Sequence, residues 1–269
     1  MTNNNDLLLK AIEIAKHAGF LILQWYGDDS ARITLKSDTS PLTKADLASH
    51  DYIVSVLTDT SIPIVSEERD CAFSIRKDWK LFWLVDPLDG TKDFLERNGE
   101  FTVSIALIRD GEPVLGVVHA PAIGITYYAR EGTGAYCEKE GKVHKLPCFP
   151  SKEPITATVS RQHLSQTTID FLTKNGITRF APKGSCLKFG VVASGRANIY
   201  PRFEGSMEWD IAAGHIIITE SGCHIIDLVT GTSPRYNKPS FLNNPFIVYT
   251  PDIRYEKLSI PRIQDNRGG

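Results

Sequence analysis

The first regular pattern of apolar and polar positions along the chain predicts an amphipathic helix. Over residues 6–26 apolar side chains recur at mostly helical spacing, with lysine and glutamate residues opposite them. Gly27 is the expected end of this helix. Such a helix packs one face against a protein core. The alternative, binding at a membrane surface, is not favoured because the polar face is not strongly basic.

The next patterns alternate between strands and one further helix. A polar loop at residues 37–46 leads into a second helix that we expect to end near Leu57, and residues 62–65 predict a strand. The short apolar run at residues 81–85 is bounded by turn residues and predicts a buried strand that ends at Asp86. Two β-rich runs, 101–108 and 114–118, flank an Asp-Gly turn, which predicts a hairpin that residues 125–129 continue.

The second half of the chain predicts strands at residues 155–160, 224–228 and 246–249, and an apolar helix that begins at Asp210. Proline and serine cluster at residues 147–154 and indicate a boundary. We therefore predict two domains: residues 1–150, an α+β unit with an antiparallel sheet, and residues 151–269, an α/β unit.

Composition narrows the classes of function. Hydrophobic residues make up 42% of the chain and charged residues 23%, as in globular proteins. The 30 basic and 32 acidic residues provide no general positive field, so nucleic acid is not an expected partner. Five scattered cysteines without a CxxC pair indicate reduced thiols. No segment resembles a signal peptide or a membrane span, so we expect a cytoplasmic protein, with peripheral attachment to the inner face of the cell membrane as an alternative.

Candidate chemistry gathers where the strand at residues 81–85 ends. Asp86 ends the strand and Asp89 follows across a tight turn, so both carboxylates and the Leu88 carbonyl can converge on one point. Such oxygen ligands suit a hard cation. Gly90 and Thr91 offer N–H groups and a hydroxyl for a phosphate or its attacking water. The same residues are also favourable in an ordinary turn.

The string Asp-Pro-Leu-Asp-Gly-Thr at residues 86–91 resembles the signature of the inositol monophosphatase superfamily, which consists of Mg²⁺-dependent, lithium-sensitive phosphatases. Trp-Asp-Ile-Ala-Ala-Gly at residues 209–214 resembles the second motif of that superfamily. The motifs appear in family order over nearly the whole chain. The resemblance implies the layered αβαβα fold of the sugar phosphatases, a mixed α+β and α/β architecture.

The resemblance also implies a metal site with two Mg²⁺ ions. Glu67, Asp86 and the Leu88 carbonyl would hold one ion, and Asp86, Asp89 and Asp210 would hold the other. A third ion near Glu67 is an alternative. Two of these carboxylates also have a simpler explanation. Adjacent glutamates such as Glu67 and Glu68 are usually exposed to solvent, and Asp210 could cap its helix.

Asp46 is the candidate partner of Thr91. The resemblance implies that these two residues form a hydrogen bond and activate a water. Together with Glu67 they are the expected catalytic residues. Thr43 followed by Asp46 also resembles a capping box at a helix start, which would explain Asp46 without catalysis.

Three further segments, residues 160–163, 184–189 and 200–203, resemble the 3'(2'),5'-bisphosphate nucleotidases of sulfate assimilation. The resemblance implies that Ser185, Lys188 and Arg202 bind a second phosphate, for which a hydroxyl, an ammonium and a guanidinium are suitable. His163 is included, although a lone histidine after a strand is usually a loop residue. The complete expected substrate site is Glu67, Leu88, Asp89, Gly90, Thr91, His163, Ser185, Lys188, Arg202 and Asp210.

The expected reaction is hydrolysis of the 3'-phosphate of adenosine 3',5'-bisphosphate to AMP, with Mg²⁺ as cofactor and a nucleotide as the small-molecule partner. The alternative enzyme is an inositol or sugar monophosphatase with the same metal site. A non-catalytic metal- or nucleotide-binding protein is the contrasting class, and a homodimer is a further expectation of the resemblance.

Overall fold

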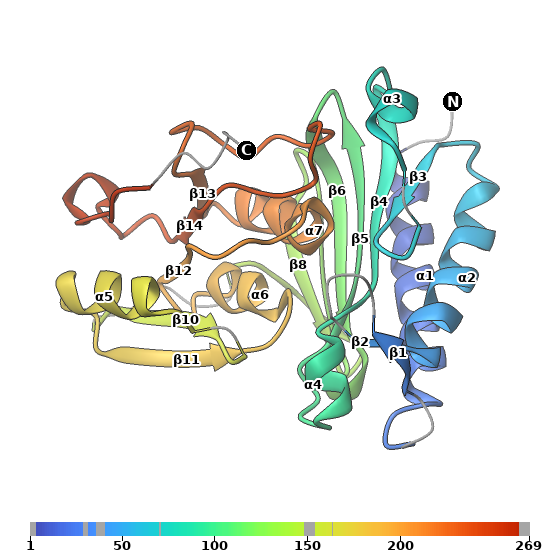
Figure 1. Ribbon diagram of the computed structural model, residues 1–269, viewed down its shortest axis with the longest axis horizontal. Helices are drawn as coiled ribbons and strands as arrows, with labels where there is room; N and C mark the ends of the chain where they lie inside the picture. Colours follow the sequence, from blue (N-terminus) through green and yellow to red (C-terminus); the bar gives the residue numbers. More distant parts are fainter. Residues whose placement is uncertain are drawn as a thin grey trace.

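The computed structural model describes residues 4–28, 32–35, 41–69, 71–147, 154–162 and 164–263, which form five layers in the order αβαβα (Figure 1). Helices α1 (Asn4–Leu23) and α2 (Lys44–Thr58) cover one face of a seven-stranded sheet. Helices α6 (Leu187–Ala193) and α7 (Glu208–Glu220) lie between this sheet and a five-stranded sheet, whose outer face is covered by α5 (Gln166–Lys174). The layered fold that the resemblance implied is confirmed.

The seven-stranded sheet is antiparallel except for its first pair, β3 and β4, which run parallel. The predicted hairpin and its continuation are confirmed as β5, β6 and β7, whereas β8 and β9 were not predicted. In spatial order the strands are β3 (Ile64–Ser66), β4 (Leu81–Asp89), β5 (Thr102–Arg109), β6 (Glu112–Ala120), β7 (Ile125–Arg130), β8 (Gly134–Lys139) and β9 (Lys142–Lys145). The short elements around this sheet are β1 (Arg32–Leu35), β2 (Pro41–Thr43), α3 (Phe73–Arg76), α4 (Thr91–Leu95) and η2 (Pro121–Ile123).

The five-stranded sheet is mixed. Its order is β11 (Arg179–Lys183), β10 (Thr156–Ser160), β12 (Ile199–Arg202), β14 (Phe246–Tyr249) and β13 (His224–Asp227), and η3 (Tyr255–Lys257) follows it along the chain. Strands β10, β13 and β14 confirm the predictions. Each sheet uses residues from one side of residue 150, but α7 packs against the first sheet and one buried cluster unites both halves. The division into two domains therefore stays a prediction.

The side chains of β4 alternate between two cores. Trp83 and Val85 belong to the cluster under α1 and α2, whereas Phe82 and Leu84 belong to the cluster that contains α7. Because alternate residues of a strand share a face, Asp86 continues the second series and lies on the side of α7. The end of β4 thus delivers a carboxylate to the middle layer of the molecule.

Two predicted element ends need correction. Strand β4 does not end at Asp86: pairing is interrupted there and resumes when Asp89 pairs with Thr102. Pro87 lacks an N–H for the ladder, so the chain bulges and then rejoins the sheet. Helix α1 ends at Leu23, before Gly27, because a turn intervenes.

Close approach of the middle helices to their neighbours depends on glycine. A Cβ on Gly190 of α6 would lie 2.3 Å from the ring of Tyr127 in β7, and a Cβ on Gly214 of α7 would lie 2.3 Å from the ring of Phe189. Real Cβ atoms do not approach so closely. These two glycines therefore allow α6 and α7 to fit between the sheets.

Two expectations from composition can be compared with the structure. The four cysteines within the described residues, Cys71, Cys137, Cys186 and Cys223, are free thiols. Among the described residues, no helix has both the length and the apolar composition that are needed to cross a membrane.

Candidate active site

Glu67 and Asp86 are neighbours because two parallel strands end side by side. Ser66, the last residue of β3, pairs with Val85 of β4. The Glu67 N–H donates to the Val85 carbonyl over 3.1 Å, and the Glu67 carboxyl lies within hydrogen-bonding reach of the Asp86 carboxyl. The parallel pairing of β3 and β4 thus brings these two carboxylates to one edge of the sheet.

Asp89 follows on the far side of the bulge, and one of its oxygens is held firmly. Its Oδ2 accepts hydrogen bonds from the Ser185 hydroxyl (2.5 Å), the Cys186 N–H (2.6 Å) and, more weakly, the Thr102 hydroxyl (3.5 Å). Because these bonds all use Oδ2, Oδ1 is the oxygen that Asp89 can offer to an ion. Gly90 follows with φ of +90°, a left-handed conformation that favours glycine.

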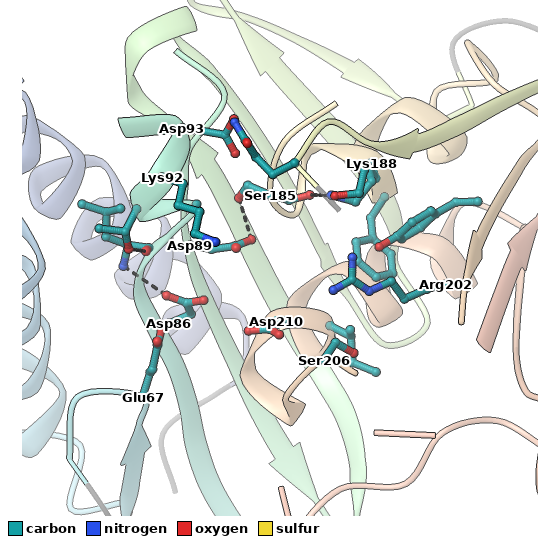
Figure 2. Close-up of a pocket in the computed structure, with 18 of the residues that line it drawn as sticks. Glu67, Asp86, Asp89, Lys92, Asp93, Ser185, Lys188, Arg202, Ser206 and Asp210 are labelled. Atoms are coloured by element: carbon teal, nitrogen blue, oxygen red, sulfur yellow. Dashed lines mark hydrogen bonds between the residues drawn. The ribbon is translucent and has the colours of Figure 1, made fainter. Parts of the chain in front are cut away.

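Asp210 approaches the same place from the first turn of α7. Figure 2 shows its carboxylate facing Asp86 across the pocket. Its Oδ2 accepts the N–H of Met207 over 2.7 Å. Met207 itself occupies the N-cap position, so Asp210 caps the helix from three residues further on. This bond occupies one carboxylate oxygen and leaves the other able to bind an ion.

The two sets of hydrogen bonds expected for Asp46 are both present in the structure. Asp46 is buried in the first turn of α2, and its Oδ2 accepts the N–H and the hydroxyl of Thr43 over 2.7 and 2.5 Å, which completes a capping box. Its Oδ1 accepts the Thr91 hydroxyl over 3.2 Å. Capping therefore does not compete with the bond to Thr91, because the two functions use different oxygens.

The electrostatics of the site favour a cation. Burial raises the pKa of Asp86 well above its usual range, and the charges of Glu67, Asp89 and Asp210 raise it further. Burial likewise raises the pKa of Asp210, with Asp89 and Glu67 adding to the effect. A divalent ion would remove this repulsion, and carboxylate and carbonyl oxygens are its preferred ligands. The donor set fits a hard divalent cation.

The carboxylates are not gathered into a finished coordination shell. In the part of the chain that the structure describes, no three Asp, Glu, His or Cys side chains stand close enough together to hold an ion as they are. Figure 2 shows the four carboxylates spaced around one opening. We expect a bound ion to draw them inward, since it replaces mutual repulsion by attraction.

These groups line a cavity of about 270 Å³ between the two sheets. Its walls contain every predicted site residue except two. Asp46 is absent from the lining but accepts a hydrogen bond from Thr91, and His163 lies outside the described residues. The full lining is Pro41, Glu67, Asp86, Leu88, Asp89, Gly90, Thr91, Lys92, Asp93, Ser160, Gln162, Ser185, Lys188, Phe189, Tyr200, Arg202, Ser206, Asp210 and Ile211.

Lys92 is a cavity residue that was not selected from the sequence. Its side chain is exposed, and in Figure 2 its ammonium extends toward Asp89. A lysine in a short polar helix is usually a solvent-facing charge, so nothing local distinguished it. Its position directly after the Gly90-Thr91 turn was the one available signal.

The three residues predicted to bind a second phosphate occupy different environments. Ser185 already donates to Asp89, and Lys188 is buried, with its ammonium donating to the Ser185 carbonyl over 2.7 Å. Arg202 donates from Nη2 to the Gly205 carbonyl, but its buried Nε has no hydrogen-bond partner among the described residues. Arg202 is thus the member of the set with an unused donor at the cavity.

Glu100 joins the two halves of the chain beside the cavity. Arg161 donates to both of its carboxylate oxygens (2.9 and 3.0 Å), Lys183 donates to Oε1 (2.6 Å), and the Gly184 N–H donates to Oε2 (2.8 Å). Burial alone would raise the pKa of Glu100, but the hydrogen bonds from Arg161, Lys183 and Gly184 outweigh it and lower the pKa from 4.5 to about 2.

The lowered pKa predicts how stability depends on pH. Because the folded-state pKa lies below the unfolded one, Glu100 stabilises the fold above about pH 4.5 and loses this contribution as the pH falls toward 2. Glu100→Gln should therefore lower the free energy of unfolding at pH 7 by about 1–2 kcal/mol, a figure that allows for solvent screening of Arg161 and Lys183.

Urea titrations at several pH values measure this effect. The gap between parent and Glu100→Gln should narrow between pH 5 and pH 3, whereas Glu112→Gln, which affects an exposed ion pair with Arg235, should show almost no gap at any pH. A gap for Glu100→Gln that stays constant over this range would contradict the assigned pKa.

Comparison with known proteins agrees with the motifs. The model of the inositol monophosphatase family matches residues 4–259. The chain is 42% identical over 245 residues to the 3'(2'),5'-bisphosphate nucleotidase CysQ of Salmonella typhimurium, an alignment that covers 90% of this chain and 99% of the relative. It is 39% identical over 245 residues to the protein of the same name from Escherichia coli K12, with the same coverage.

The fold agrees as well. The crystal structure of CysQ from Bacteroides thetaiotaomicron, described as a bacterial member of the inositol monophosphatase family, superposes with a TM-score of 0.82 at 39% identity and covers 91% of this chain and 97% of that one. Sequence, fold and the arrangement of carboxylates lead to the same conclusion. The chain belongs to the inositol monophosphatase family.

Proposed function

We propose that this protein is a Mg²⁺-dependent phosphatase that hydrolyses the 3'-phosphate of adenosine 3',5'-bisphosphate to give AMP and phosphate, in support of sulfate assimilation. The observation that carries the proposal is one cavity in which the four candidate metal carboxylates lie across from Arg202, with Lys92 extended toward Asp89. Relatives with 39–42% identity bear the name bisphosphate nucleotidase, which agrees with this assignment.

In this proposal, Glu67, Asp86 and the Leu88 carbonyl would hold one ion, and Asp86, Asp89 and Asp210 would hold a second. Membership of the family implies dependence on a divalent metal; the choice of Mg²⁺ and the number of ions are part of the proposal. When bound, two divalent ions stabilise both the attacking and the leaving oxygen of an in-line displacement at phosphorus. No covalent enzyme intermediate is needed.

The pair of Thr91 and Asp46 orients the attacking water. The Thr91 hydroxyl donates its proton to Asp46 Oδ1, so a lone pair of the Thr91 oxygen is available to accept a hydrogen bond from water. Thr43 fixes the other oxygen of Asp46, which prevents the carboxylate from turning away. The chain thereby supplies a positioned proton acceptor next to the carboxylates.

The phosphate that is not cleaved is assigned to the cationic side of the cavity. The buried Nε of Arg202 lacks a partner among the described residues, and a phosphate oxygen would satisfy it. Lys92 adds an exposed ammonium that can reach the same substrate. The buried ammonium of Lys188 adds positive charge near this phosphate while it donates a hydrogen bond to the Ser185 carbonyl.

The second candidate is an inositol or sugar monophosphatase, since the family name and the same metal carboxylates suit it. A monophosphate leaves Arg202 Nε unsatisfied, which favours the bisphosphate. A phosphate-release assay with Mg²⁺ tests this choice on a panel of adenosine 3',5'-bisphosphate, a sulfated adenosine nucleotide as a candidate second substrate, and inositol monophosphate. The same assay excludes or establishes a non-catalytic binding role. Homodimer formation and a cytoplasmic location stay predictions.

Arg202→Ala tests the second-phosphate site directly. We expect kcat/KM for adenosine 3',5'-bisphosphate to fall by about one to two decades, the loss of a charged hydrogen bond. Turnover of adenosine 3'-monophosphate should be poor and about equal in variant and parent, because that substrate has no second phosphate.

The comparison between substrates separates binding from folding. Arg179→Ala, which alters an exposed arginine on the edge strand β11, should change neither value. Equal losses on both substrates for Arg202→Ala, or a parent enzyme that prefers inositol monophosphate, would return the assignment to the monophosphatase.

A further inference from the structure

Two of the four hydrogen bonds of Glu100 come from a single turn of the chain, and the other two come from Arg161. Lys183 ends strand β11, and Gly184 follows it, so two of the three donor residues are consecutive. The third, Arg161, follows β10, which pairs with β11. The Glu100 side chain is nearly buried and carries a full negative charge at neutral pH, since its pKa lies near 2. It therefore fixes the start of the turn at residues 183–186.

The turn has little freedom to move. A Cβ on Gly184 would lie 2.5 Å from the Glu100 carbonyl and 2.6 Å from Asp93 Oδ2, so only glycine fits against this wall. Ser185 then adopts φ of +54°, a conformation that non-glycine residues keep only where the surroundings enforce it. Lys188 holds the turn from the other side through the Ser185 carbonyl.

The far end of the turn touches the metal site. The Ser185 hydroxyl and the Cys186 N–H both donate to Asp89 Oδ2, and they are the two shortest bonds to that oxygen. If the turn shifted, both donors would shift together, and Asp89 would lose the contacts that set its rotamer. The path from Glu100 to Asp89 thus runs through three consecutive residues without a gap.

We propose that Glu100 is a positioning residue of the active site, which acts through residues 184–186 to hold Asp89 with Oδ1 directed at a divalent ion. The proposal rests on the proposed function only in taking Asp89 as an ion ligand. It also gives a role to Arg161, part of the segment 160–163 that resembles the nucleotidases: Arg161 keeps the Glu100 carboxylate in place.

The test is Mg²⁺ binding to the full-length protein by calorimetry, together with the Mg²⁺ concentration at half-maximal phosphate release. Glu100→Ala should weaken Mg²⁺ affinity about tenfold, as expected when the support of a metal ligand is removed. Glu100→Gln should lose less, because its amide oxygen can still accept the Gly184 N–H. Glu112→Gln, far from the cavity in an exposed ion pair, should bind Mg²⁺ like the parent.

A double-mutant cycle distinguishes positioning from general stability. Ser185→Ala removes one bond to Asp89 directly, and its effect on Mg²⁺ affinity should be less than multiplicative with that of Glu100→Ala, since both act on one carboxylate. Multiplicative losses, or a folded Glu100→Ala protein with a lower melting temperature and unchanged Mg²⁺ affinity, would overturn the proposal.

A second variant and the activity of the parent protein keep the test decisive. If Glu100→Ala does not fold, Lys183→Met, which removes one bond to Glu100 and keeps the bulk, replaces it with the same expected direction. If the parent binds Mg²⁺ and releases no phosphate from any nucleotide, the proposed function fails, while the affinity comparison still decides the role of Glu100.

Discussion

Asp210→Asn should lower kcat/KM for the bisphosphate by about three decades or more, because it removes one ligand charge from the metal site. The amide keeps the shape of the side chain, and its oxygen can still accept the N–H of Met207, so helix α7 should begin as before. Asp89→Asn should lower kcat/KM to a similar extent, because it also removes a ligand charge. The local structure should be kept, since the amide oxygen can still accept the hydrogen bonds from Ser185 and Cys186.

Phosphate release and melting temperature, each with and without Mg²⁺, check this prediction. Without the ion the Asp210→Asn protein should melt no lower than the parent, because burial and neighbouring charges disfavour the ionised carboxylate. The rise in melting temperature on adding Mg²⁺ should shrink. Asp170→Asn on the outer helix α5 is the matched control. Phosphate release by Asp210→Asn near the parent level would refute the metal site.

Thr91→Ala should lower kcat by about 10²-fold or more while Mg²⁺ still binds, because the four metal carboxylates remain and one proton acceptor is lost. Thr91→Ser keeps the hydroxyl that bonds to Asp46 and should retain most of the activity. Calorimetry with Mg²⁺ and steady-state kinetics separate the two properties.

Loss of Mg²⁺ binding in Thr91→Ala would contradict this role of Thr91. Should Thr91→Ala lose Mg²⁺ binding together with activity, the hydroxyl would be a structural support of the Leu88 carbonyl, to which it can also donate over 3.4 Å. The pairing of Thr91 with Asp46 would then have no part in orienting water.

Patterns within about ten residues were enough to predict the main elements. The hairpin β5–β6 follows from two apolar runs around Asp110-Gly111, and α7 follows from its continuous apolar composition. Strand β9, in contrast, is exposed along its whole length and carries no alternation of apolar residues, so nothing in its sequence marks it as a strand.

The parts of the site that were missed depend on contacts between distant positions. Ser185 lies 96 residues from Asp89, to which it donates, and Lys183 lies 83 residues from Glu100. No local pattern encodes such pairs, and the side chain of a glutamate or lysine in a loop is ordinarily exposed to solvent. The resemblance to a family implies a phosphate-binding role for Ser185, which stays a prediction; its hydrogen bond to Asp89 could not be read from the sequence.

The burial of α7 on all sides has a consequence for how the protein opens. Residues Ile211 to Ile218 are buried without interruption, since a sheet covers the helix on each side. Amide hydrogens in such a layer exchange with solvent only when most of the molecule unfolds, whereas outer helices such as α5 can open locally. Because Asp210 stands on this protected helix, fraying of the outer layers would leave it in place, whereas Asp46 on the outer helix α2 would share in such openings.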